Sequence, residues 1–490
     1  MKRFFMFLLI VSFLILAGCD NGSGGDGKTH ADFDTWNEWL SHKYGKEFGY
    51  DAASGLGPLK APITHNMSAE EYLFVKGINA GWNMGNTYDL NSNPRYNDGR
   101  FNLLFAGIKK AGFNVIRIPV TWGSQSPGNT INTSYLDEIE LVVTAAHAAG
   151  LVVFINTHHD KGFFSLDQAG ASLRDQGETG ANFVSMTNRF TIIWTQIATR
   201  FKDYGDWLMF EPINEPTIGN PPQWDGALPV YHEVLNRWNQ GFIEAVRDTG
   251  GNNEKRYLFF KSYAGKLQTS LQQANGFRIP TDPAGSGRLI FSFHSYVPQP
   301  LGLEGQNTNW NANFARQYSS AFEQAMEAYG YKGIPVFLGE TGATFHSQRT
   351  GDDPTISGNN GSSANANLNR LLLLNAMGYE ARKYGVIPVL WDNGEATRGA
   401  SQNQPNGETF ALFRRKDAHD TIRENWGLPI DHTLLNGGSN PRSSGGQPMN
   451  SGNTAFNDPD FGVRTIEAFI DAVNGRTKLG EPRLDPPAGN

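Results

Sequence analysis

The amino-acid sequence predicts an α/β fold, a (β/α)8 TIM barrel with long βα loops. Two observations lead to this prediction: short apolar runs recur eight times along the chain, and segments with helical periodicity lie between most of them. Near-continuous apolar runs are typical of strands that are buried on both faces, as in a parallel sheet. The same alternation would also fit a doubly wound sheet, but eight regular units favour the barrel.

The expected strands are short, and VIRIPV, LVVFIN and PVFLGE are the clearest examples. In chain order, strands are expected at residues 76–83, 113–120, 151–158, 206–212, 256–262, 289–296, 334–340 and 386–392. Helices are expected at residues 99–111, 135–149, 183–202, 231–248, 312–329, 366–384 and 463–474. The helix after the fifth strand has the weakest pattern. The longest loop, 393–461, follows the last strand and is rich in Gly, Asn and Pro.

The composition excludes several classes of protein. The chain has 490 residues and a single cysteine, so it forms no intrachain disulfide and no four-cysteine zinc site. Its 41 basic and 48 acidic side chains give a net charge of −7, which makes nucleic acid an unexpected partner. The length would suit about three domains of ~150 residues, but α/β barrels often exceed that size as one unit.

The N-terminal segment has the pattern of an export signal. Lys2 and Arg3 precede an apolar run at 4–16 that only Ser12 interrupts. As a helix this run would rise ~20 Å, which is short for a hydrocarbon core of ~30 Å. The sequence therefore predicts a signal peptide at residues 1–18 rather than a membrane-spanning helix.

The only cysteine, Cys19, follows this segment directly. The sequence Leu16-Ala17-Gly18-Cys19 resembles the bacterial lipobox, which implies cleavage before Cys19 and attachment of diacylglycerol to its sulfur. Several acyl chains would then anchor an exported lipoprotein in a lipid bilayer, facing the periplasm or the cell surface. Residues 19–30 would serve as the lipidated start and a flexible tether. The alternative is simple secretion, with Cys19 incidental.

The remaining chain divides into three parts. Residues 31–75, with Trp36 and Trp39, would cap the barrel floor or form a small lobe beside it. Residues 76–475 would form the catalytic barrel, and residues 476–490 a C-terminal tail. We expect the protein to be a monomer.

Polar residues stand at or near the ends of six expected strands. Catalytic groups of TIM barrels lie at the carboxyl ends of the strands. A charged residue that ends an apolar strand is costly unless it is paired or functional. The residues concerned are Arg117, His158-His159-Asp160, Asn214-Glu215-Pro216, His294-Ser295-Tyr296, Glu340 and Trp391-Asp392.

Two of these residues, Glu215 and Glu340, come from the fourth and seventh strands and would face each other across the mouth of the barrel. Hydrolysis of a glycosidic bond needs such a pair, one carboxylic acid and one carboxylate. A separation of ~5–5.5 Å indicates retention of configuration and a wider one inversion. The sequence leaves this distance open. It also leaves Glu211 as an alternative to Glu215 for the first carboxyl group of the pair. The two residues are four positions apart, so on one strand both would point to the same face.

Several motifs support a resemblance to a known family. They are FNVIRIP at 113–119, INTHH at 155–159, FEPINEP at 210–216, HSY at 294–296 and LGE at 338–340. In this order they resemble glycoside hydrolase family 5. The motifs GWNMGNT at 81–87 and WDNG at 391–394 look like its endoglucanase and xyloglucanase branch.

The resemblance implies a retaining mechanism in which Glu215 is the acid/base and Glu340 the nucleophile. It also implies a set of substrate-binding residues, namely Arg117, His158, Asn214, His294, Tyr296 and Trp391, with His159, Asn86 and Trp82 as further candidates. We expect Arg117 to lower the pKa of Glu340, and repulsion from Glu340 to raise that of Glu215. No cofactor and no metal is expected, because the His-x-His spacing of barrel metallohydrolases is absent.

The predicted function is that of a surface-tethered endo-β-1,4-glucanase acting on β-glucan or xyloglucan. A β-mannanase and a xyloglucan-specific enzyme are the nearest enzyme alternatives. A catalytically silent glycan-binding lipoprotein is another, although it would have no need for both glutamates. The loop aromatics Trp122, Trp224, Trp310 and Phe345 could be sugar platforms or ordinary packing residues.

Overall fold

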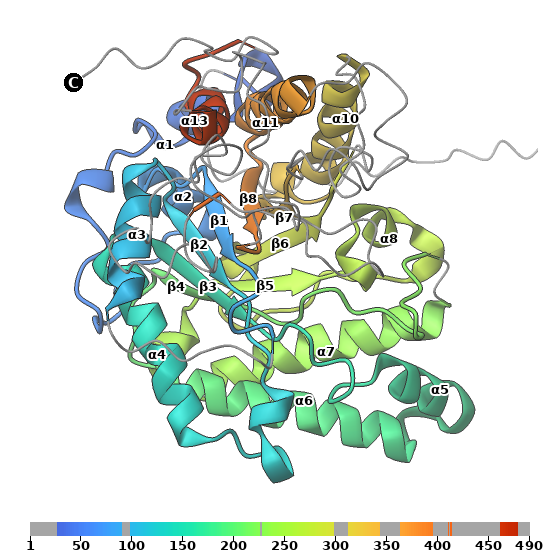
Figure 1. Cartoon of the computed structure of the whole chain (residues 1–490). Coiled ribbons are helices and arrows are strands. Elements are labelled where there is room, and N and C mark those ends of the chain that lie inside the picture. Colours follow the sequence, from blue (N-terminus) through green and yellow to red (C-terminus); the bar gives the residue numbers. More distant parts are fainter. Residues whose placement is uncertain are drawn as a thin grey trace, which may run out of the picture.

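The computed structural model describes residues 27–90, 99–225, 228–297, 312–343, 363–394, 410, 412, 413 and 461–478. Eight strands form a closed barrel in the order β1 to β8, and each strand pairs in parallel with its neighbours. Figure 1 shows the strands at the centre with helices packed around them. The predicted (β/α)8 barrel is therefore confirmed, and a doubly wound sheet is excluded because β1 pairs with β8.

Each predicted strand is present, with shorter bounds. The strands are β1 Gly81–Met84, β2 Val115–Ile118, β3 Val152–Asn156, β4 Leu208–Glu211, β5 Leu258–Lys261, β6 Leu289–His294, β7 Val336–Thr341 and β8 Ile387–Asp392. The largest difference is at the first strand, which was expected from residue 76. Gly77 there has a φ of +68°, which turns the chain after a preceding helix before the strand begins.

The helices alternate with the strands. They are α3 Arg100–Lys110, α4 Thr133–Ala148, α6 Ala181–Phe201, α7 Pro229–Arg247, α10 Ala312–Ala328, α11 Ser363–Tyr384 and α13 Phe461–Val473, all close to prediction, with the short α8 Leu267–Leu271 after β5. A further helix, α5 Leu166–Gln176, was not predicted. Its buried side includes Gly170 and Ser172, so it lacks a continuous apolar stripe.

Side chains inside the barrel change from apolar to polar along the strands. An apolar cluster fills the lower interior, including Phe154, Phe259 and Phe337, whose rings lie 4.7 to 5.7 Å apart. Two residues further along β3 and β5 stand Asn156 and Lys261, both fully buried. Successive side chains of a strand point to opposite faces, so residues two apart share the interior. The strands thus carry a buried polar layer on top of an apolar one.

Residues before the first strand cover the amino-terminal end of the barrel. The helices here are α1 Trp36–Tyr44 and α2 Ala69–Val75. Tyr72 and Ile78 belong to the same apolar cluster as the lower barrel interior, and the Tyr72 ring lies 5.0 Å from that of Tyr257. This part of the chain therefore closes the floor of the barrel, opposite the predicted catalytic mouth.

Some predicted features lie outside the described residues. These are the signal peptide and Cys19, most of the loop after β8, Trp310, Phe345 and the tail beyond residue 478. None of the helices in the described part of the chain is long and apolar enough to cross a membrane.

Candidate active site

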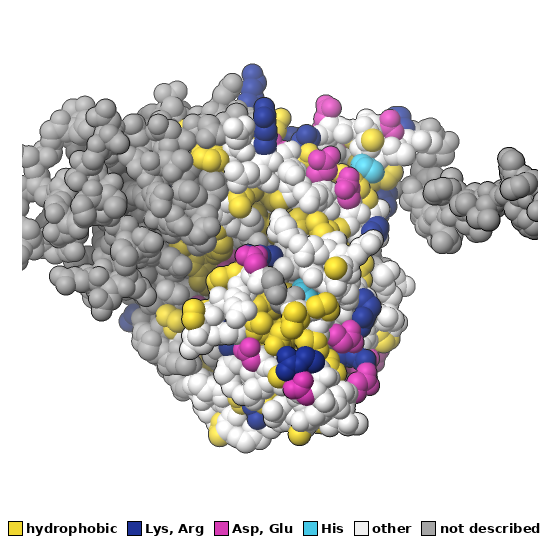
Figure 2. Space-filling view, turned by 90° about the vertical axis from the view of Figure 1, so that its right-hand side faces the viewer, with side chains coloured by type: hydrophobic (Ala, Val, Ile, Leu, Met, Phe, Trp, Pro, Cys, Tyr) yellow, Lys and Arg dark blue, Asp and Glu magenta, His cyan; other side chains and the backbone are white. Residues whose placement is uncertain are grey.

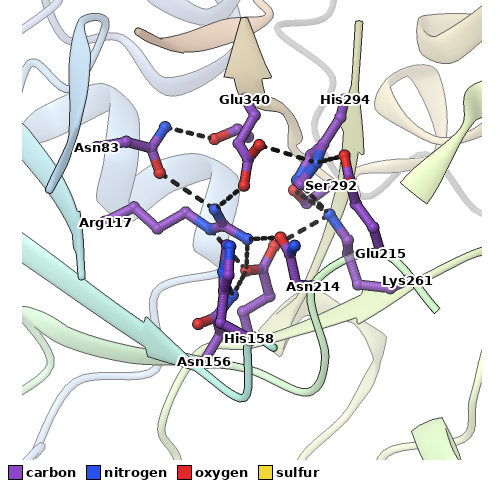
Figure 3. Close-up of polar contacts among 12 residues, drawn as sticks. Asn83, Arg117, Asn156, His158, Asn214, Glu215, Lys261, Ser292, His294 and Glu340 are labelled. Carbon is purple, nitrogen blue, oxygen red and sulfur yellow. Dashed lines mark hydrogen bonds and ion pairs between the residues drawn. The ribbon is translucent and has the colours of Figure 1, made fainter. Parts of the chain in front are cut away.

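Glu215 and Glu340 face each other at the mouth of the barrel. Glu215 follows β4, and Glu340 lies on β7, where the pairing register shifts. An oxygen of the Glu215 carboxylate lies within 4.8 Å of an oxygen of the Glu340 carboxylate. His294 stands between them, with Nδ1 2.8 Å from Oε1 of Glu215 and 3.6 Å from Oε2 of Glu340 (Figure 3). This distance belongs to the shorter of the two classes of carboxylate pair. In that class one glutamate acts as nucleophile and the other as acid, and no water molecule has to fit between them.

Arg117 connects the site from below. Its Nη1 donates to Oε1 of Glu340 at 2.5 Å, its Nε to Oε2 of Glu211 at 2.7 Å, and its Nη2 to Oδ1 of Asn214 at 2.7 Å. The guanidinium is fully buried, so each of these contacts replaces water that it lost on folding. One cation therefore orients the predicted nucleophile and the predicted sugar-binding amide together.

Glu211 lies beneath the site and not in it. It is fully buried and accepts hydrogen bonds from Arg117 and, at 3.0 Å, from Nδ2 of Asn156. Its other oxygen forms an ion pair of 3.2 Å with Lys261. Because this carboxylate is enclosed and paired, Glu215 is the one of the two glutamates at the end of β4 that is open to the mouth.

Lys261 is a site residue that we did not predict. It ends β5 inside the barrel, fully buried, and its Nζ lies 2.8 Å from Nε2 of His294. A lysine that ends the apolar run LFF meets the same criterion that identified the other six strand ends. Applying that criterion to the fifth strand would have found it. Asn83 on β1 was also missed; its Oδ1 accepts from Arg117 at 3.1 Å.

The environment of the two glutamates separates their roles. Burial, together with repulsion from Glu340, raises the pKa of Glu215 to about 8, so that this carboxyl holds a proton near neutral pH. Burial also raises the pKa of Glu340, although the Arg117 guanidinium opposes it. Our expectation of a lowered pKa for Glu340 was wrong in net direction, because burial outweighs the ion pair. Arg117 contacts Glu340 and not Glu215. The cation therefore favours the ionised form of Glu340, and of the two carboxyl groups Glu215 is the one that holds a proton.

Three other predicted residues lie around this pair. The Tyr296 hydroxyl donates to Oε2 of Glu340 at 3.1 Å. The rings of His158 and Trp391 lie parallel, at an angle of 8° and a centroid distance of 5.9 Å. Burial keeps the pKa of His158 well below its ordinary value, so the ring is neutral. On the face of the molecule seen in Figure 2, hydrophobic side chains gather around a hollow beside a histidine.

Trp82 does not reach the mouth, and its predicted contact with substrate is wrong. Its side chain is fully buried on the helix side of β1, and Nε1 donates to Oδ2 of Asp392 at 3.0 Å. The neighbouring Asn83 points inward instead, because side chains alternate along a strand. Asn86 lies in a turn with a φ of +52°, and its main-chain N–H donates to Asp89.

His159 and Asp160 follow β3 in different environments. The His159 side chain is half-exposed, 3.9 Å from the carboxylate of Asp89. Asp160 is buried and accepts main-chain hydrogen bonds from Trp122 and Gly123, so it supports the loop. Burial raises its pKa to about 6.

The two loop aromatics inside the described residues differ. Trp122 is fully buried and bonded to the main chain of Asn156, so it is a packing residue. Trp224 is 41% exposed, and Nζ of Lys161 lies 5.5 Å from the centre of its ring. Lys161 lines one small pocket together with Glu215. Trp224 therefore stands on the acid side of the mouth.

Two groups of residues in the described part of the chain have the spacing of a metal site: Glu215, His294 and Glu340, and Asp89, His158 and His159. In both groups several donor atoms already serve hydrogen bonds within the protein. His294 Nδ1 bonds Glu215, and the carboxylate of Asp89 accepts from the main chain of Asn86 and Thr87. The acid–base chemistry of the two glutamates needs no ion in either place.

A TIM barrel with a protonated and a guanidinium-bound glutamate at this distance across its mouth defines a glycoside hydrolase of the double-displacement type. The chain belongs to the cellulase family, glycosyl hydrolase family 5, whose family model matches residues 76–397. The resemblance that the motifs indicated is thereby confirmed.

Comparisons with individual proteins agree with this family. The chain is similar to endoglucanase A of Clostridium longisporum, at 31% identity over 73% of this chain and 64% of that protein. It is also similar to endoglucanase A of Paenibacillus barcinonensis, at 32% identity over 69% and 84% of the two chains. Among solved structures, a GH5-4 broad specificity endoglucanase from Ruminococcus champanellensis with bound cellotriose matches at a TM-score of 0.57 and 28% identity, over 71% of this chain and 94% of that one. The chain spans less than two thirds of the Clostridium longisporum protein.

Proposed function

We propose that this protein is a retaining endo-β-1,4-glucanase that hydrolyses β-glucan or xyloglucan. The observation that carries the proposal is the pair of carboxylates within 4.8 Å, of which Glu215 has a pKa of about 8 and Glu340 is bound to Arg117. This combination supplies a proton donor and a nucleophile at neutral pH.

The proposed reaction has two steps. In the first, Glu340 attacks the anomeric carbon while Glu215 gives its proton to the departing glycosidic oxygen, so a covalent glycosyl-enzyme forms and the shortened chain leaves. In the second, the ionised Glu215 takes a proton from water, and the water oxygen replaces Glu340 at the anomeric carbon. Glu340 leaves as a carboxylate, Glu215 is protonated again, and the sugar keeps its configuration.

The surrounding residues would serve this reaction in distinct ways. Asn214 can donate to the sugar 2-OH, where hydrogen bonds strengthen in the transition state. The Tyr296 hydroxyl holds Glu340 without adding a charge. Trp391 offers a flat apolar face to the pyranose ring. The similarity to endoglucanases, one of them solved with cellotriose, supports a β-1,4-glucan rather than another polymer.

Specificity for xyloglucan alone, or for mannan, remains the alternative among enzymes, because loops after the strands select the substrate. A silent glycan-binding protein is disfavoured by the protonated Glu215. Binding alone requires neither this raised pKa nor a second carboxylate at close range.

The proposal is tested by assaying the full chain on carboxymethylcellulose, xyloglucan, lichenan, mannan and xylan. Product lengths distinguish internal from terminal cleavage, and NMR of the first products reports their anomeric configuration. We expect mixed oligosaccharides of retained β configuration from the glucans. Inverted products would contradict the mechanism, and turnover restricted to mannan or xylan would contradict the substrate class.

We further propose that Cys19 carries a diacylglycerol anchor and that the barrel works as a membrane-tethered monomer. The support for the anchor is the lipobox-like sequence before the only cysteine. In a bacterial host, Cys19→Ser should move the protein from the membrane fraction to the soluble fraction. Unchanged fractionation would contradict the anchor, and a dimer in detergent would contradict the monomer.

A further inference from the structure

Lys261 occupies an unusual position for a lysine, directly below the acid/base. Its side chain is fully buried at the end of β5, inside the barrel. Buried lysines are rare and require partners. Asn239 on α7 fixes the main chain at this point, because its amide accepts from the Lys261 N–H at 3.1 Å and donates to the Lys261 carbonyl at 2.8 Å.

The ammonium group has three donor protons, and three acceptors surround it. Nζ lies 2.8 Å from Nε2 of His294, 3.3 Å from Oγ of Ser292 and 3.2 Å from Oε1 of Glu211 (Figure 3). Lysine donates and never accepts when it is charged. Each of the three partners must therefore present a lone pair to it.

The buried layer as a whole supports a charged Lys261. Two cations, Arg117 and Lys261, lie among two carboxylates, Glu211 and Glu340. These charges balance when Glu215 holds its proton. A neutral Lys261 would leave one negative charge uncompensated in a region without solvent, which is costly.

A charged Lys261 determines the protonation of His294. Because Nε2 of the ring accepts from the ammonium, the single proton of the neutral imidazole lies on Nδ1. The nearest acceptor for this Nδ1–H group is Oε1 of Glu215, at 2.8 Å. Burial and the two nearby cations keep the pKa of His294 well below its ordinary value, so the ring does not gain a second proton.

We propose that Lys261 is a positioning residue of the acid/base: through His294 it makes Oε1 of Glu215 an acceptor and so leaves the transferable proton on Oε2. This inference rests on the proposed glycosidase function only for its kinetic consequence. The tautomer of His294 follows from the charge on Lys261 and from the two contacts of the ring. Lys261 does not touch the substrate and acts through the imidazole.

A purely structural role for Lys261 is the competing explanation. In that case the ammonium only neutralises Glu211, and its removal would weaken the whole site without regard to the leaving group. The two roles differ in two measurable quantities, namely the tautomer of His294 and the dependence of the rate on leaving-group protonation.

The first test uses the full chain labelled with 15N-histidine. The chain has 11 histidines, and the signal of His294 is identified by its loss in His294→Asn. We expect the wild-type ring to be neutral with the proton on Nδ1. A proton on Nε2, or a doubly protonated ring at neutral pH, would overturn the proposal. This measurement needs no variant of Lys261 and no activity.

The second test compares Lys261→Met with the wild type on two substrates. On lichenan we expect the variant to lose about 10- to 100-fold in kcat/KM, a part of the 10²- to 10⁴-fold that general acid catalysis supplies. On 2,4-dinitrophenyl cellobioside, whose leaving group needs no proton, the loss in kcat/KM, which reports only the first step, should stay below about threefold. Lys202→Met, at an exposed site, is the matched control and should behave as the wild type.

Equal losses on both substrates would assign Lys261 a structural role and overturn the proposal. If Lys261→Met does not fold, the wild-type tautomer decides. If the wild type hydrolyses no glucan but its His294 ring carries the proton on Nδ1, the proposed function is contradicted. The inference about how Lys261 sets the protonation of His294 would still hold.

Discussion

Oδ1 of Asn214 accepts a hydrogen bond of 2.7 Å from Nη2 of Arg117. This contact orients the side-chain amide, so that its donor group, Nδ2, is the one left for a ligand. The same guanidinium donates to Glu340 at 2.5 Å. The nucleophile and the amide that would hold the sugar 2-OH therefore share one rigid anchor, and neither can shift without the other.

Asn214→Ala should lower kcat/KM on β-glucan by about 10²-fold, since hydrogen bonds to the 2-OH strengthen in the transition state and are worth several kcal/mol. The loss should fall mainly on kcat, because the interaction is weaker in the ground state. Steady-state kinetics check this, with thermal unfolding to show an intact fold. A rise in KM at constant kcat would instead show that Asn214 only binds.

Glu340→Gln should reduce hydrolysis by more than about 10⁴-fold, the scale of loss when a covalent nucleophile is removed. The amide keeps the shape of the side chain and can still accept from Arg117. Binding of cellotriose, measured by calorimetry, should therefore persist. Substantial turnover in this variant would reject Glu340 as the nucleophile.

Glu215→Ala should lose about 10²- to 10⁴-fold on glucan, the usual contribution of a general acid. The first step on an aryl cellobioside with a good leaving group should be far less affected, because that group departs without a proton. Burst kinetics separate the two steps of the reaction. A first step impaired equally on both substrates would argue against the acid role.

Activity should fall at alkaline pH as Glu215 loses its proton. Its pKa of about 8 predicts the alkaline limb of kcat/KM near that pH. The folded state keeps a proton that the unfolded state releases above its ordinary pKa of 4.5, so stability should fall as pH rises from 4.5 to about 8. Glu215→Gln cannot titrate and should lose less stability over this range in urea titrations. An equal loss in both proteins would contradict the raised pKa.

The fold could be predicted because strands buried on both faces leave apolar runs that the sequence displays directly. Burial on both faces also means that the sequence does not show whether a given side chain points into the barrel or towards the helices. All four residues of β1 are buried, so nothing in the sequence distinguished Trp82, which faces the helices, from Asn83, which faces the site. The motif alone therefore led to the wrong residue.

The polar residues at the strand ends predicted where the site lies. They did not predict which charged side chains of the site pair with one another. Lys261 pairs in register with Ser292 of β6, and this register brings its ammonium to His294. Register between strands far apart in the sequence depends on closure of the barrel, which no single motif records. The roles of Glu211 and Lys261 consequently emerged only from the assembled structure.

Trp224→Ala should reveal a platform for the leaving part of the glucan. Trp224 is 41% exposed on the acid side of the mouth. Its loop is held by the Tyr263 hydroxyl, which donates to the carbonyl of Gln223 at 2.6 Å. Loss of an aromatic contact of about 1 kcal/mol should lower kcat/KM on long glucans by several-fold to tenfold. An aryl cellobioside has no sugar on that side and should be cleaved at the wild-type rate. Tyr50→Ala, which removes an aromatic ring 70% exposed before the barrel, is the matched control and should change neither rate. An unchanged rate on long glucans, or equal losses on both substrates, would show that Trp224 does not hold the leaving chain.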